Sequence, residues 1–303
     1  MRQNGFVSDG YDGEAIGRLV NGGASSRALV VAAHPDDEAI GAGALLKYLS
    51  NAAFIHVTDG AARNMRAAVA RGFQTREAYA GARRGELLRA LNQMRSAPVE
   101  LIEFGIADLE ASYNLVEASL RTLDAIKRLR PDAVFVHPYE GGHPDHDAAA
   151  FSARAAVELM RQEGEKPPAL VEFTSYHARG HRGMATSSFL PGTAPEVEVR
   201  LTDDERAFKI EMFSCYATQR NALRQFEVLL ERFRRAPIYD FTRPAHPGRL
   251  FYQNFEWGLP WQKWRALVRK AISRLGLLNG PRVGQDRAGI WRKNSLKIFF
   301  TVR

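Results

Sequence analysis

Short runs of apolar residues alternate with longer amphipathic segments from about residue 27 onwards. The short runs are typical of buried strands, and the amphipathic segments are typical of helices. The expected strands cover residues 28–33, 53–58, 99–103, 132–137, 170–175 and 197–201. The expected helices cover residues 38–50, 77–94, 115–129 and 147–160, two helices between 203 and 235, and a last helix over 257–275.

This alternation predicts an α/β fold with a Rossmann-like, mostly parallel sheet and helices on both faces. We expect an N-terminal arm at residues 1–26, a main domain at 27–235, and a basic C-terminal extension at 236–303 that packs on the body. In such sheets, ligands bind beyond the carboxyl ends of the strands. The turns that follow the strands are therefore the places to look for chemistry.

The turn after the first expected strand reads His34-Pro35-Asp36-Asp37-Glu38. Crowding an imidazole against adjacent carboxylates is costly unless a cation offsets their repulsion. The structural alternative is a helix cap, because Asp is a common residue at that position. We assign Glu38 to the first helical turn, where acids are favoured, rather than to catalysis.

A second polar turn, His143-Pro144-Asp145-His146, follows the strand expected at 132–137. Both turns should meet at the carboxyl edge of the sheet, which brings imidazoles and carboxylates to one point. Zinc suits these donors, since its catalytic sites use three nitrogen or oxygen protein ligands and keep one position open. Cys215 is the only cysteine, so no cysteine cluster could hold the metal, and we expect a packed thiol there.

Together, the two motifs resemble those of the LmbE-like, or PIG-L, family of zinc-dependent de-N-acetylases. The resemblance covers about residues 27–225 and includes Arg83-Arg84-Gly85-Glu86-Leu87 and residues 209–219. It implies that residues 27–235 form a catalytic domain that removes an N-acetyl group from an amino sugar or glycoconjugate by activating water on a metal. The implied cofactor is one Zn²⁺ per chain, with Fe²⁺ as an alternative.

The resemblance also assigns individual roles. His34, Asp37 and His146 would be the metal ligands. Asp36 would be the general base that deprotonates the attacking water, and His143 would stabilise the oxyanion or protonate the leaving amine.

Two further positions qualify this assignment. Asp145 is expected to orient His143 or His146 through the second imidazole nitrogen. Some family members carry a tyrosine two residues before the first histidine of the second motif, where this chain has Gly141. The contribution of such a tyrosine to oxyanion binding is therefore absent here or comes from Tyr139.

The Gly- and Arg-rich connection at residues 59–75 is a candidate substrate loop, because it is longer than most connections. Asp59 should open towards the pocket. The basic side chains of this connection either bind the substrate or form a solvated surface, and they are Arg63, Arg66 and Arg71. For His177 and His181, an ordinary loop role is favoured over lining the pocket.

The net charge of +8 belongs to the end of the chain. Residues 263–303 hold eleven Lys and Arg and one acid, which gives this segment +10 and leaves about −2 for the rest. Docking of the basic helix on the body is favoured over peripheral membrane contact, and nucleic acid comes last because no recognition motif accompanies the charge.

The start of the chain lacks a secretory pattern, so a cytoplasmic location is expected, and the sequence makes no prediction of oligomeric state. Two functional alternatives stay open. One is an amidase of the same family that cleaves a different acyl or thiol-conjugate amide. The other is a non-catalytic sugar or nucleotide-binding module, which is disfavoured because Gly41-Ala42-Gly43 lies inside the first helix rather than in the preceding turn.

Overall fold

The computed structural model describes residues 27–94, 100–180, 183–192 and 194–277. The predicted arm at 1–26, the last part of the extension at 278–303, and His181 lie outside the described residues. No helix within the described ranges is long and apolar enough to cross a membrane.

The secondary structure alternates strands and helices as far as residue 173. The strands are β1 (Arg27–Ala32), β2 (Asn51–Ala62), β3 (Glu100–Asp108), β4 (Ala133–Val136), β5 (Ala169–Phe173), β6 (Tyr176–Arg179), β7 (Gly183–Thr186), β8 (Glu196–Arg200) and β9 (Leu230–Arg235). The α-helices are α2 (Asp37–Leu46), α3 (Arg66–Val69), α4 (Arg76–Leu91), α5 (Leu115–Leu129), α6 (Pro144–Gln162), α7 (Asp203–Ser214), α8 (Arg220–Leu223) and α9 (Trp261–Arg274). The described residues also contain three 3₁₀ helices, which are η1 (Ala111–Tyr113), η2 (Ala217–Gln219) and η3 (Phe251–Asn254).

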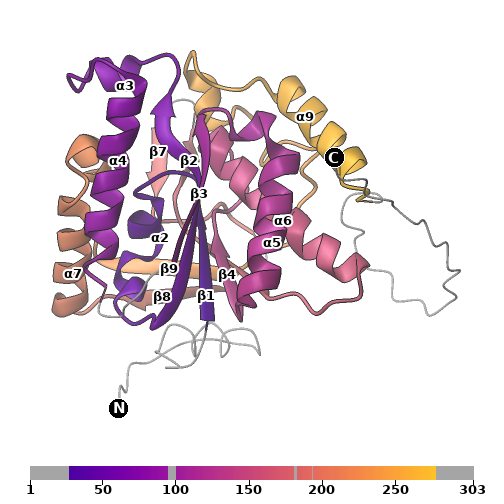
Figure 1. The fold of residues 1–303 in the computed structure, drawn as a ribbon, viewed down its shortest axis with the longest axis horizontal. Helices are drawn as coiled ribbons and strands as arrows, with labels where there is room; N and C mark the ends of the chain where they lie inside the picture. Colours follow the sequence, from indigo (N-terminus) through magenta and orange to yellow (C-terminus); the bar gives the residue numbers. More distant parts are fainter. Residues whose placement is uncertain (1–26, 95–99, 181–182, 193, 278–303) are drawn as a thin grey trace, which may run out of the picture.

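One seven-stranded sheet organises the fold, with the strand order β3-β2-β1-β4-β5-β9-β8. The first five strands are parallel, whereas β9 runs antiparallel to both β5 and β8. The α/β fold with a mostly parallel sheet is confirmed. Helices α2, α4 and α7 cover one face, and α5, α6 and α9 cover the other (Figure 1).

Side chains along β1 point alternately into the hydrophobic cores on the two faces of the sheet. Leu29 and Val31 belong to the core beneath α5 and α6, whereas Ala28 and Val30 belong to the core beneath α2 and α4. All four are buried, because a central parallel strand is covered on both faces. Gly41 in α2 is required by this packing, since a Cβ there would lie 2.0 Å from the ring of Phe173 on β5.

The prediction of a second helix ending near residue 235 is wrong. After α7, only the short α8 is helical, and Leu230–Arg235 forms strand β9. Period-two burial decides the structure, because Glu231 and Phe233 point into the core. The charges of this segment resemble those of a surface helix, but Glu231 and Arg234 are buried against ion partners.

Two strands are longer than predicted, and this changes the surroundings of the site. β2 continues to Ala62 rather than ending near residue 58, and β3 continues to Asp108 rather than ending near 103. Little of the connection at 59–75 is therefore irregular loop, because it contains the end of β2 and the helix α3. The extension of β3 carries Asp108 to the carboxyl edge of the sheet.

The described part of the C-terminal extension lies against the body. α9 packs beside α5 (Figure 1), and its side chains of Trp264 and Val268 are fully buried. The Trp264 indole donates to the Phe241 carbonyl at 3.1 Å. The basic residues of α9, among them Lys263 and Arg265, are exposed on the side of the helix that faces solvent.

Candidate metal centre

The two predicted turns meet where β1 and β4 lie side by side. The turn at residues 34–37 follows β1, and the segment at 137–146 follows β4. The helices that leave these strands diverge, because α2 packs on one face of the sheet and α6 on the other. Such a switch point opens a crevice at the carboxyl edge of a parallel sheet, and it is the usual place for a ligand.

Asp37 lies at the centre of the cluster. Its Oδ2 is 3.1 Å from His34 Nδ1 and 3.3 Å from His137 Nε2, and its Oδ1 is 3.2 Å from His146 Nε2. Burial alone would raise the pKa of Asp37, but its electrostatic interactions with these imidazoles, together with the hydrogen bond to His137, outweigh burial and hold the pKa well below its usual range. The carboxylate is therefore ionised and available to a cation.

His34 joins this carboxylate to two others. Its Nε2 lies 3.2 Å from Asp108 and 3.3 Å from Asp145, on the side of the ring away from Asp37. Burial opposes a charge on His34, but Asp37, Asp108 and Asp145 together raise its pKa well above the ordinary value. The ring is thus fixed in orientation from both nitrogens.

The expected partner of Asp145 is not the one with the shortest contact. Asp145 was predicted to orient His143 or His146, yet its Oδ2 is 3.3 Å from His34 and 3.9 Å from His143. Its carboxylate also accepts the backbone N–H groups of Leu109 at 2.6 Å and Ala111 at 3.0 Å. Asp145 therefore anchors the segment after β3 to the centre of the cluster.

Both histidines of the second motif are neutral. Burial, followed by the charges of neighbouring histidines, lowers the pKa of His146 to about 3 and that of His143 well below its ordinary value. Neutral imidazole beside an ionised carboxylate is the donor set of catalytic zinc sites. Donor atoms of Asp37, His137 and His146, and those of His34, His143 and His146, lie within 4.8 Å of one another. The buried cluster can therefore hold a metal ion.

Asp36 stands in an unusual backbone conformation. Its φ of 127° lies in a region that residues other than glycine rarely adopt. Such a strained backbone conformation persists only where neighbouring groups hold it in place. Burial and the adjacent carboxylates raise the pKa of Asp36 to about 8, although the nearby Arg83 guanidinium works against this rise. A carboxyl group with a pKa near neutrality is suited to accept and return a proton.

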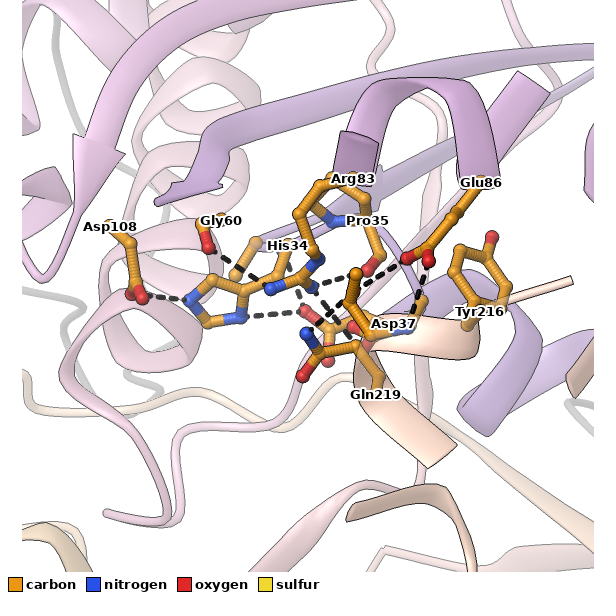
Figure 2. Close-up of polar contacts among 12 residues, drawn as sticks. His34, Pro35, Asp37, Gly60, Arg83, Glu86, Asp108, Tyr216 and Gln219 are labelled. Atoms are coloured by element: carbon orange, nitrogen blue, oxygen red, sulfur yellow. Dashed lines mark hydrogen bonds and ion pairs between the residues drawn. The ribbon is translucent and has the colours of Figure 1, made fainter. Parts of the chain in front are cut away.

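Arg83, on α4, holds the turn that contains Asp36. Its guanidinium donates to the Pro35 carbonyl at 2.6 Å and to the Gly60 carbonyl at 3.0 Å, as Figure 2 shows. The same group lies 3.4 Å from Asp36 Oδ2. The sequence indicates the motif around residue 83 only through the family resemblance, and the geometry gives Arg83 a positioning role.

Glu38 lies behind the cluster and contacts the body of the fold. It is fully buried, its Oε2 lies 2.9 Å from His56 Nε2, and it accepts the hydroxyl of Tyr216. It also accepts the backbone N–H of Asp36 at 3.2 Å. Its position in the first turn of α2 is as predicted, and its contacts tie that turn to β2 and to the end of α7.

Several predicted pocket residues lie elsewhere. Asp59 pairs with Arg76, and Arg63 pairs with Glu110 at 2.7 Å on the surface. Arg71 donates to the Thr218 carbonyl. Of the loop arginines, Arg66 alone is among the described residues that line a cavity near the cluster.

Tyr139 does not reach the cluster. Its ring stacks on Trp264, and its hydroxyl donates to the Arg243 carbonyl at 2.8 Å. A tyrosine at position 141 is also excluded, because a Cβ on Gly141 would lie 2.7 Å from Leu250 and φ there is +70°. Tyr176 faces the cluster instead, since it lines both cavities described below.

Three residues of the site, His137, Asp108 and Tyr176, were not predicted from the sequence. His137 was included in the strand at 132–137 without a role, although it ends that strand just before the second motif. Asp108 was hidden because β3 was expected to end five residues earlier. Tyr176 directly precedes the predicted candidate His177, whose Nδ1–H donates to the Ala178 carbonyl at 3.0 Å.

Two adjoining cavities surround the cluster. The smaller has a volume of about 170 Å³ and is lined by Asp36, Asp37, Arg83 and the histidines at 34, 143 and 146. The larger has a volume of about 570 Å³. They share lining residues, among them Asp108, His143 and Tyr176, so the second cavity extends the first.

Comparisons with known proteins agree with this description. Residues 29–157 match the family model described as GlcNAc-PI de-N-acetylase, PIG-L. A comparison with curated protein sequences finds no match. A deacetylase of the teicoplanin biosynthesis pathway is 19% identical, with a TM-score of 0.52, over 69% of this chain and 97% of that chain. The A40926 pseudoaglycone deacetylase Dbv21 is 20% identical, with a TM-score of 0.52, over 69% of this chain and 96% of that chain.

The two structures establish a shared fold over most of their own length. The family match adds similarity in sequence at the site itself, because it spans both turns of the cluster, from β1 to α6. Residues 29–157 therefore match the model of the PIG-L, or LmbE-like, family.

Proposed function

We propose that the protein is a zinc-dependent hydrolase that removes an acetyl group from the nitrogen of an amino sugar or glycoconjugate. The observation that carries the proposal is the division of labour between adjacent carboxylates. Asp37 is ionised among imidazoles, whereas Asp36 faces the same cavity with a pKa of about 8. The family description and the deacetylases with the same fold support the choice of an N-acetyl substrate.

His34, Asp37 and His146 would hold the ion, and His34 would give up a ring proton to do so, because only an unprotonated imidazole nitrogen can bind a metal. His137 would buttress Asp37 and stack on His146. The His137 and His146 rings are 4.0 Å apart and nearly parallel. When bound, zinc polarises the amide carbonyl and lowers the pKa of nearby water.

Asp36 would accept a proton from the water as its oxygen bonds to the carbonyl carbon. His143 is placed to stabilise the negative charge that develops on the carbonyl oxygen. Its Nδ1 accepts the Asp145 backbone N–H at 3.2 Å, so the proton of the neutral ring is assigned to Nε2, which is a donor. A donor directed at developing charge favours the transition state over the ground state.

Collapse of the tetrahedral species breaks the carbon–nitrogen bond. The leaving nitrogen needs a proton, and the protonated Asp36 would return the one it took from water. The products are acetate and a free amine. No net proton is lost from the side chains in a turnover, which fits a base whose pKa lies close to neutrality.

The test is a panel of N-acylated sugars incubated with the zinc-loaded protein, with free amine and carboxylic acid measured for each. Acetate and amine should appear together, and Asp36→Asn should reduce kcat by at least about a hundredfold, the usual size of a lost acid–base group. Asp132→Asn is the matched control, because Asp132 lies at the opposite end of β4 and pairs with the Arg27 backbone.

Each rival predicts a different result. An amidase of the same family would release a longer acyl or thiol-conjugate amine in preference to acetate. A binding module would bind sugar without releasing amine and would hold no stoichiometric zinc. An Asp36→Asn protein as active as its parent would overturn the proposed mechanism.

A further inference from the structure

The larger cavity is built mainly from apolar side chains. Its aromatic and sulfur-containing wall consists of Tyr176, Met184, Phe226, Phe251, Phe255 and Trp257. A volume of about 570 Å³ falls within the range of about 300–1,000 Å³ typical of small-molecule sites. The cavity is thus large enough for a substantial part of a ligand beyond the acetamido group.

Residues outside the family match form part of this wall. Phe251, Phe255 and Trp257 come from the segment between β9 and α9, which the sequence analysis assigned to an appended extension. The Phe255 and Trp257 rings are stacked, with centroids 4.7 Å apart and planes within 6°. Trp257 also contacts the ring of His143, at 5.0 Å between centroids. The extension therefore completes the active-site cleft.

The charged side chains that line this larger cavity, called the groove from here on, already have ion-pair partners. Among its described lining residues, the formally charged ones are Arg66 and Asp108. Asp108 is bound to His34, and Arg66 pairs with Glu256 at 2.7 Å. Because Glu256 lies between Phe255 and Trp257, this ion pair joins α3 to the aromatic segment across the groove. No array of cations is present among these lining residues to receive a phosphate or a carboxylate.

We propose that the groove binds an apolar group attached to the amino sugar, an inference that rests on the proposed deacetylase function. The substrate is then an amphiphilic glycoconjugate. Its acetamido end enters the cluster beside Asp36, and an aromatic or hydrocarbon group lies on Phe255 and Trp257. Burying such a group against stacked aromatic rings is favourable, whereas a polyol or an anion would lose its hydration there without compensation.

The test compares kcat/KM for the methyl, phenyl and 2-naphthyl glycosides of N-acetylglucosamine, with the zinc-loaded full chain. We expect kcat/KM to rise about tenfold from methyl to naphthyl, as one aromatic group becomes stacked and buried. A 4-carboxyphenyl glycoside should be no better than the phenyl one. Equal values for the whole series, or a preference for the carboxylate, would overturn the proposal.

Two variants assign the preference to the groove. Trp257→Ala and Phe255→Ala should reduce the naphthyl-to-methyl ratio towards one, and Phe255, which is 40% exposed, can be shortened without opening the core. Tyr113→Ala is the control, since this aromatic residue is 53% exposed and lies outside the groove. A ratio that is unchanged in both groove variants would contradict the assignment.

Failure of the parent proposal gives a separate signature. If no glycoside of the series yields free amine, the deacetylase function is wrong, but the groove can still be assayed by calorimetric binding of 2-naphthyl glucosaminide. Binding that is lost in Phe255→Ala but kept in Tyr113→Ala would support the groove. No detectable binding would refute it.

Discussion

The guanidinium of Arg83 donates to the carbonyl oxygen of Pro35 at 2.6 Å, directly before the strained residue Asp36. A positive φ of 127° would relax if the preceding peptide were free to turn. Arg83 prevents this from α4, a helix that the sequence separates widely from the turn. The orientation of the candidate base is therefore fixed by a residue outside both metal-binding motifs.

Replacing Arg83 with methionine should reduce kcat about a hundredfold and change KM little, because small misplacements of a catalytic group are costly. Removing the guanidinium also removes the charge that opposes the rise in the pKa of Asp36. The acid limb of the kcat profile should consequently move to higher pH. Arg84→Met is the control, since Arg84 lies on the same helix but is exposed and pairs with Glu103 of β3. A slower enzyme with an unshifted pH profile would argue against this electrostatic role.

The sequence predicts the frame of the site well, because local patterns determine it. The apolar run of β1, the helix over Leu115–Leu129 and the two polar turns all have strong local signals. The meeting of those turns follows from parallel topology alone. The distances within the cluster then follow from the adjacent positions of β1 and β4 in the sheet.

Residues that act through distant contacts could not be predicted in this way. Asp108 reaches His34 only because β3 continues beyond its apolar run, and Trp257 reaches His143 from a segment with no periodic pattern. Strand β9 was mistaken for a helix because its charges are buried in ion pairs. Burial of a charge depends on a partner far along the chain, which a local pattern does not reveal.

A buried ion pair between Lys209 and Glu231 supports the helix that carries Asp37. Helix α2 departs from helical geometry at Ala42, which leaves backbone groups on both sides of the kink without helical partners. Lys209 donates to the Ile40 carbonyl at 2.9 Å, and Glu231 accepts the N–H groups of Ala44 and Leu45. The pair itself spans 2.9 Å with both side chains 1% exposed.

Lys209→Met should therefore lower the free energy of unfolding by about 3–5 kcal/mol, because it leaves a buried carboxylate without its countercharge. Chemical denaturation with urea measures this change. Arg84→Ala, which breaks an exposed pair, should cost less than about 1 kcal/mol. Comparable costs for the two variants would show that the buried pair contributes little beyond a surface contact.

Glu140 makes folding stability depend on pH. Burial raises its pKa from 4.5 to about 8, and the Arg234 guanidinium at 3.1 Å only partly opposes this. The folded state then holds a proton that the unfolded state releases, so stability is fully present below about pH 4.5 and falls as pH rises towards 8.

Glu140→Gln should flatten this dependence and raise stability above pH 8 relative to the parent, by an amount on the order of a few kcal/mol. Urea denaturation between pH 5 and 9 checks the slope. Glu158→Gln is the control, because Glu158 pairs with Arg161 on the surface. If the two variants kept the slope of the parent protein, Glu140 would not be its source.

Removing the metal should abolish activity and also lower thermal stability, since an ion that binds only the folded state stabilises it by mass action. The expected gain is about 2.7 kcal/mol when free zinc exceeds its dissociation constant a hundredfold. Melting curves with a chelator and with added zinc measure this difference directly. His146→Ala and Asp37→Asn should melt at the same temperature in both conditions, because each lacks a proposed ligand. His246→Ala should respond like the parent, since His246 is outside the cluster and contacts the Pro247 carbonyl. A zinc-dependent shift that survives in Asp37→Asn would place the ion elsewhere, because the carboxylate contacted by His34, His137 and His146 would then be dispensable for binding.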